Sequence, residues 1–189
     1  MTENRPFVIR QKIKETVSKE NIILAFSQAE KRLTETLKTG EALTSRNNAL
    51  VSITAAIIVA LCAYIISNWK GFASIDTKTW TAFAAVGYSL ILSAIMLSNI
   101  LPSGYKVTGS HPIDFVTDEY YLSNLTEDQK TIALYANEIE DFQKRIDINS
   151  CVNRGRSIRY IVSVIALILM PCIIALIYFV LEAIKTSSE

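Results

Sequence analysis

Three long apolar stretches alternate with charged segments along this chain of 189 residues. No Asp, Glu, Lys or Arg occurs in residues 47–69, 79–105 or 160–181. A helix rises about 1.5 Å per residue, so about 20 apolar residues cross the roughly 30 Å hydrocarbon layer of a bilayer. The pattern therefore predicts an all-α membrane protein with three transmembrane helices, a cytoplasmic helical arm and a helical middle segment.

The same pattern divides the chain into five parts. We predict a helical arm over 1–48, a transmembrane hairpin over 49–101 with spans 49–68 and 80–101, a loop with an amphipathic helix over 102–157, a third span over 158–182 and a tail over 183–189. The first apolar stretch follows a long charged arm, so we expect an uncleaved insertion signal and no cleavable signal peptide.

Basic residues are distributed unevenly between the two sides of the predicted spans. The arm and the middle segment are rich in Lys and Arg, whereas the loop between the first two spans offers Lys70 and Lys78, and the tail offers Lys185. Lys and Arg accumulate on cytoplasmic flanks. We expect a multi-pass protein of the bacterial inner membrane with its N-terminus in the cytoplasm, and Trp69 and Trp80 as anchors at the outer interface.

Each polar segment carries one apolar stripe at helical spacing. The stripe in the arm has intervals of three and four and is made of Ile22, Phe26, Ala29, Leu33 and Leu37. Gly40 is a possible break in that helix. In the middle segment, Thr126 and Gln129 fit a capping box.

The second stripe follows that capping box with heptad-like spacing. It consists of Ile132, Tyr135, Ile139, Phe142 and Ile146, and is continued by Asn149 and Asn153. The helix can run into the third span, with Gly155 as its weak point. The two stripes pack against each other or against copies in neighbouring subunits. Two helices make a thin core, so we expect a homo-oligomer in which the second stripe is the seam.

Small and polar residues recur inside the second span. Ala85, Ser89 and Ser93 are spaced by four, and Asn99 follows. Small residues let helices approach closely in a membrane, so these residues serve helix packing or, in an oligomer, line a polar pore. No acid or base lies in mid-span, which disfavours coupled transport.

The chain lacks the residue patterns of known catalytic and cofactor sites. No GxxxxGK[ST], GxGxxG, HExxH or GxSxG occurs. His111 is followed by Asp114 and Asp118 without a nucleophile, and a local hydrogen bond is the favoured role. The three cysteines have no metal-ligand spacing. We expect no enzymatic activity, no metal and no cofactor.

Basic side chains crowd the approach to the third span. The set comprises Lys106, Lys144, Arg145, Arg154, Arg156 and Arg159. One interpretation is topology determination with contact to anionic lipid heads. The other is capture of a phosphate-bearing ligand, a nucleotide or short oligonucleotide, because the guanidinium fork donates hydrogen bonds in pairs.

The layout resembles small bacterial membrane effectors of anti-phage defence, namely the SLATT and Pycsar-type effectors and the channel component of Hailong-type systems. The likeness lies in the basic arm through Arg46, the close span pair around Trp69 and Trp80, the exit at 101–106 and the helix containing 137–145. The resemblance implies a cytoplasmic nucleotide signal that controls membrane damage or ion flow, with a nucleotidyltransferase or its product as partner.

Two functions follow from the sequence as hypotheses. The first is an oligomeric inner-membrane effector whose cytoplasmic helices receive a signal and whose spans open an ion path. The second is a membrane anchor or scaffold that recruits a soluble cytoplasmic partner through the two stripes.

Overall fold

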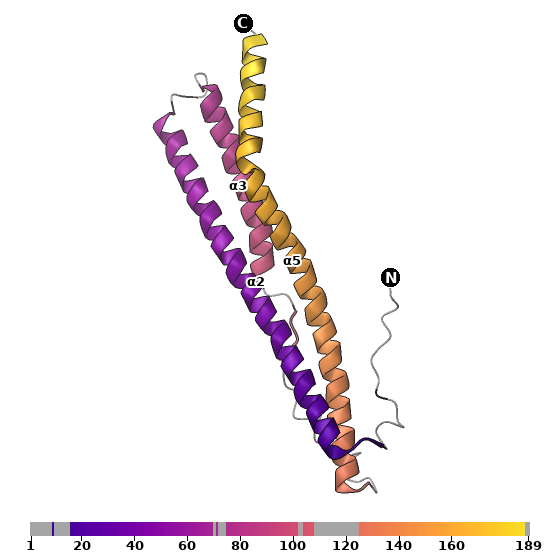
Figure 1. Cartoon of the computed structure of the whole chain (residues 1–189). Coiled ribbons are helices and arrows are strands. Elements are labelled where there is room, and N and C mark those ends of the chain that lie inside the picture. Colours follow the sequence, from indigo (N-terminus) through magenta and orange to yellow (C-terminus); the bar gives the residue numbers. More distant parts are fainter. Residues whose placement is uncertain are drawn as a thin grey trace. The chain divides into compact units, whose positions relative to one another are not determined.

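The computed structural model, in the part of the chain that it describes, contains three helices, α2 (Lys19–Ser67), α3 (Thr77–Ile100) and α5 (Glu127–Ser187), shown in Figure 1. It describes residues 9, 16–69, 71, 75–101, 104–107 and 125–187. Each helix is long and apolar enough to cross a membrane, so the predicted all-α class with three spans is confirmed. The sequence predictions on His111, Asp114 and Asp118 lie outside the described residues.

Helices α2 and α5 each join a polar segment to a span without interruption. Helix α2 has 49 residues and continues through Gly40, and α5 has 61 residues and continues through Gly155. Gly40 therefore does not interrupt α2, because a single glycine destabilises a helix by only about 1 kcal/mol. Pro171 lies inside α5, and Figure 1 shows a change of direction in the golden part of α5 that carries it.

The starts of α3 and α5 are fixed by capping side chains. The predicted capping box is confirmed, since the Thr126 N–H donates to Gln129 Oε1 at 3.0 Å and the Gln129 N–H donates to Thr126 Oγ1 at 3.4 Å. At α3, the N–H of Thr79 donates to the carboxylate of the N-cap residue Asp76 at 2.9 Å. Hydrogen bonding from Thr79 holds the pKa of Asp76 below its usual value.

The chain folds into two compact units. Unit 1 comprises residues 1–41 and 102–154, and unit 2 comprises 42–101 and 155–189. Helices α2 and α5 contribute residues to both units, whereas α3 lies wholly in unit 2.

Unit 1 is a parallel pair formed by α2 and α5. Ile22 clusters with Ala136 and Ile139, and Leu33, further along α2, clusters with Phe142 and Ile146, further along α5. Between them the ring of Phe26 contacts Tyr135 at 4.9 Å and Phe142 at 5.3 Å. Such ring pairs contribute about 0.5–1.5 kcal/mol beyond their buried area.

The predicted seam residues are consequently used inside one chain. Ile139, Phe142 and Ile146 are buried, and Ile132 and Tyr135 are partly buried, against the stripe of α2. The two stripes therefore pack against each other within one chain, which was one of the two alternatives. A homo-oligomer would have to form through other surfaces. Beside the seam, Lys19 donates to Asp128 at 2.8 Å, and this hydrogen bond raises the pKa of Lys19. The pair is exposed and adds little stability.

Unit 2 packs α3 antiparallel to the span portions of α2 and α5. Ser93 donates to Thr54 of α2 at 2.9 Å, and the hydroxyl of Tyr88 donates to the carbonyl of Ala166 in α5 at 2.8 Å. Ala85 and Ser89 are buried in this packing, as their small size predicted. Large apolar side chains such as Val59, Ile91 and Ile168 are more than 60% exposed. Unit 2 therefore has a partly polar interior and an apolar exterior.

Candidate functional site

A buried arginine is the most costly group in the interior of unit 2. Arg156 is 3% exposed. Its Nε donates to the carbonyl of Asn99 at 2.8 Å, and its terminal nitrogen donates to the hydroxyl of Thr44 at 2.6 Å. Asn99 returns a hydrogen bond from its amide to the carbonyl of Arg156 at 3.3 Å. Burying a charge costs several kcal/mol, which these hydrogen bonds offset.

Asparagine side chains complete the layer around Arg156. The amide of Asn99 also donates to Asn47 Oδ1 at 3.4 Å, and the amide of Asn47 donates to the carbonyl of Leu43 at 2.8 Å. Asn47 and Asn99 are at most 1% exposed. Asn99 Oδ1 has no hydrogen-bond partner among the described residues. The layer thus holds one charge and one unsatisfied acceptor at the start of the apolar stretches.

Further polar side chains continue inward from this layer along the spans. Thr54 is buried and accepts from Ser93, Ser163 is buried, and Ser89 lies against Met170 Sδ at 3.9 Å. The hydroxyl of Ser163 has no partner in the described part of the chain. We call this set the polar column; its members are Asn47, Thr54, Ser89, Ser93, Asn99, Arg156 and Ser163.

The spacing of the buried residues places the column inside unit 2. In α5 the seam interval of three and four continues from Asn153 to Arg156, and then at seven-residue steps to Ser163 and Met170. Ser89 and Asn99 occupy the corresponding positions of α3, with Leu92 and Met96 between them. One face of each helix therefore turns toward the others, as in coiled-coil packing.

The members of the predicted ligand-binding set differ in their burial and in their partners. Arg156 is buried and hydrogen-bonded within unit 2, so its guanidinium does not lie at the surface. Lys144 and Arg145 pair with Asp141 at 3.3 and 3.5 Å. Arg145 also donates to the carbonyl of Val107 at 3.0 Å. These contacts engage half of the set within the protein.

The remaining members of the set are exposed. Lys106, Arg154 and Arg159 lie at the surface. The backbone of Lys106 is hydrogen-bonded to Asn149, and its side chain is exposed to solvent. Arg154 and Arg159 have no side-chain hydrogen bond or ion pair to the described residues, which makes them the available cations beside the third span.

The predicted pore residues face the interior of one chain. Ala85, Ser89 and Asn99 are at most 1% exposed, and Ser93 is half-buried in its hydrogen bond to Thr54. Their positions agree with the helix-packing alternative. They do not lie on an outer surface that neighbouring copies would line.

A second polar site lies in unit 1, where two buried asparagines of α5 hold residues 104–107. The Asn149 side chain accepts from the N–H of Lys106 and donates to its carbonyl, both at 2.9 Å. Asn153 donates to the carbonyl of Thr36 at 2.7 Å and accepts from the hydroxyl of Tyr105. We call this set the asparagine junction. It fastens the chain that leaves α3 to the α2–α5 pair.

Gly40 makes room for Tyr105 in this junction. A Cβ at position 40 would lie 2.6 Å from the Tyr105 hydroxyl oxygen. The glycine is thus a packing requirement rather than a helix break. The sequence signal for the junction is the continuation of the apolar seam by Asn149 and Asn153, since polar residues at buried positions need specific partners.

We expect Gly40→Ala to destabilise the protein by about 1 kcal/mol. Alanine gains about 1 kcal/mol in helix propensity, but it displaces the Tyr105 ring and removes the hydrogen bond that Asn153 Oδ1 accepts, which costs about 1–3 kcal/mol. In a Tyr105→Ala background the same substitution should stabilise, because the clash is gone. Thermal unfolding of the four variants measures this, and an equal effect in both backgrounds contradicts the assignment.

No known protein family, characterised protein or solved structure shows significant similarity to this chain. Cys62, Cys151 and Cys172 are free thiols. The residues that the structure describes contain no group of three His, Cys, Asp or Glu side chains that could hold a metal ion. The chemistry of the site is therefore that of buried hydrogen bonds, one buried charge and exposed cations.

Proposed function

We propose that this chain is a bacterial inner-membrane effector that conducts ions when a signal on its cytoplasmic side changes the packing of its spans. The supporting observation is the polar column inside unit 2. Membrane proteins keep polar side chains at the bundle interior or along a water-filled path. Burying a guanidinium and two oxygens without hydrogen-bond partners costs free energy that helix packing alone does not require. In a conducting state these groups would contact water and ions.

In this proposal the path is closed when the column is packed as described here. Ser89, Asn99 and Ser163 are at most 1% exposed. Arg156 occupies the end of the column that faces the cytoplasm in the proposed orientation, which follows from the excess of Lys and Arg in the arm and middle segment. Opening requires Arg156 to leave its hydrogen bonds to Asn99 and Thr44.

The signal in this proposal is a phosphate-bearing ligand, a nucleotide or short oligonucleotide made by a partner nucleotidyltransferase. Arg154 and Arg159 are the cations that remain available to it. They are five positions apart on α5, which places them about 140° apart around the helix. One ligand does not bridge both from a single helix, so the proposal requires a homo-oligomer in which neighbouring copies each contribute one arginine.

Ion flux from liposomes tests this proposal. The full-length protein is reconstituted and exposed to cyclic mononucleotides, cyclic dinucleotides and short oligoadenylates. We expect at least one of them to release ions, and Arg154→Glu with Arg159→Glu to weaken the response about tenfold or more, because charge-assisted contacts to phosphate are lost.

A charge-matched control separates this effect from net charge. Lys31→Glu with Lys38→Glu changes the charge equally at exposed positions of α2, and we expect it to leave the response unchanged. Absence of flux under every ligand, or an equal loss in both double variants, overturns the proposal.

One observation favours a membrane anchor as the second candidate. The two stripes that a partner would have used are buried against each other, but Ile23 and Leu24 of α2 are 40% and 60% exposed in unit 1. A partner protein could dock there. Copurification that is lost in Leu24→Glu, together with absent ion flux, would establish the anchor instead.

A further inference from the structure

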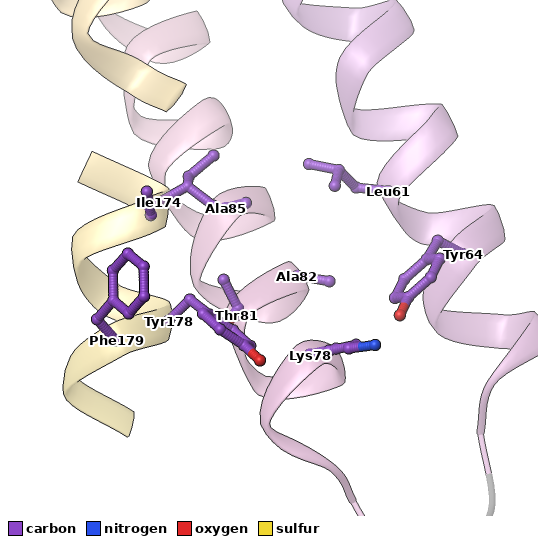
Figure 2. A pocket seen from close by; sticks show the side chains of 10 residues that line it. Leu61, Tyr64, Lys78, Thr81, Ala82, Ala85, Ile174, Tyr178 and Phe179 are labelled. Carbon is purple, nitrogen blue, oxygen red and sulfur yellow. The ribbon is translucent and has the colours of Figure 1, made fainter. Parts of the chain in front are cut away.

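A groove opens between the three helices of unit 2 at the ends nearest the loop that joins α2 to α3 (Figure 2). Leu61 and Tyr64 of α2 form one wall, residues 78–85 of α3 form the floor, and residues 174–179 of α5 form the other wall. Its volume is about 510 Å³, within the range of small-molecule sites. This equals about the volume of one turn of a helix 10 Å across, so the groove does not enclose a whole partner span.

The groove is polar at one end and apolar along its length. Figure 2 shows the hydroxyls of Tyr64 and Tyr178 and the ammonium of Lys78 toward the end nearest the loop, whereas Leu61, Ala85 and Ile174 lie deeper. The ligand that matches this arrangement is amphipathic, with a flexible apolar chain and an anionic head.

The position of the groove specifies the source of such a ligand. Its walls belong to helices that are long and apolar enough to cross a membrane, so lipid chains surround its opening. Lys78 lies in the first turn of α3, where a lysine near a span end extends its ammonium to the level of the lipid headgroups. Membrane lipid is therefore abundant at the opening of the groove, and its headgroups lie at the level of Lys78.

We propose that this groove binds one phospholipid, with an acyl chain along Leu61, Ala85 and Ala175 and the lipid phosphate at Lys78. The tyrosine hydroxyls supply hydrogen bonds to the headgroup. The bound chain fills space between the three helices and ties their packing to the composition of the membrane. This inference goes beyond the proposed function and does not depend on ion conduction.

Native mass spectrometry of the full-length protein in detergent tests the proposal with two probes. Phosphatidylglycerol carries the phosphate, and a diacylglycerol with the same chains lacks it. We expect Lys78→Gln to weaken phosphatidylglycerol binding about fivefold, as one lysine at a membrane surface does, without changing diacylglycerol binding. Ala175→Leu fills the groove from an exposed position and should weaken both about tenfold.

Matched variants outside the groove serve as controls. Lys185→Gln removes a charge from the end of α5, and Ala60→Leu enlarges an exposed residue of α2. Both should bind phosphatidylglycerol as the unaltered protein does. Binding that is insensitive to Lys78→Gln and to Ala175→Leu overturns the proposal. A dimer that binds no lipid and dissociates in Ala175→Leu also overturns it, because side chains of a second copy then occupy the groove.

Discussion

Replacing Arg156 with alanine should destabilise the protein by about 3 kcal/mol and open a leak for ions. The substitution removes two hydrogen bonds from a charged donor, each contributing about 1.5–3 kcal/mol, and leaves the carbonyl of Asn99 and the hydroxyl of Thr44 without these partners. In a chain of this length the loss corresponds to a fall of about 10 °C in Tm. Thermal unfolding in detergent measures it.

The leak follows from the position of Arg156 in the polar column. With the side chain gone, water reaches Asn99 Oδ1 and Ser163 Oγ, which are buried and have no hydrogen-bond partner among the described residues. Liposomes with Arg156→Ala should lose ions without any added ligand. Arg159→Ala is the matched control, since Arg159 is exposed three residues away, and it should change stability by less than about 0.5 kcal/mol. Equal effects of the two substitutions contradict the structural role of Arg156.

Replacing Asn149 with alanine should free residues 104–107 from the asparagine junction. Asn149 is fully buried and makes both hydrogen bonds to the backbone of Lys106, at 2.9 Å each. Their loss costs about 2–3 kcal/mol, because the N–H and carbonyl of Lys106 lose their partners together. The free energy of local opening of residues 104–107 falls by the same amount. Trypsin should therefore cleave after Lys106 at least tenfold faster.

The trypsin experiment has its control in the same unit. Asn21 is exposed in the first turn of α2, and Asn21→Ala should leave cleavage after Lys106 unchanged. Mass spectrometry of the fragments identifies the cleaved bond. If Asn149→Ala is cleaved no faster than the unaltered protein, Asn149 does not hold this segment.

The periodic parts of the fold could be predicted from sequence because each signal is local. The charge-free stretches gave three spans, and Thr126 with Gln129 gave the start of α5. Gly40 was ambiguous for a physical reason, since its role depends on Tyr105, which is far away in the chain. The choice between packing within and between chains was open because a stripe shows that a face is buried and does not identify what covers it.

The candidate site was harder to predict because sequence composition treats all arginines alike. Lys144, Arg145, Arg154, Arg156 and Arg159 form one basic cluster in the sequence, yet the structure buries Arg156 and pairs Lys144 and Arg145 with Asp141. The distinguishing signal was the heptad spacing. Arg156 continues the interval from Asn149 and Asn153, whereas Arg154 and Arg159 do not. Extending the register of an apolar seam through its polar positions would have identified the buried arginine.

The most direct measurement for the polar column is block of the leak by a thiol reagent. Cys62, Cys151 and Cys172 are first replaced, and Ser163→Cys is then introduced together with Arg156→Ala. We predict that a charged methanethiosulfonate reagent abolishes ion flux in this protein and has no effect when cysteine is placed at the exposed residue Ile168 instead. Flux that persists after complete modification at position 163 would show that ions do not pass through the interior of the three spans.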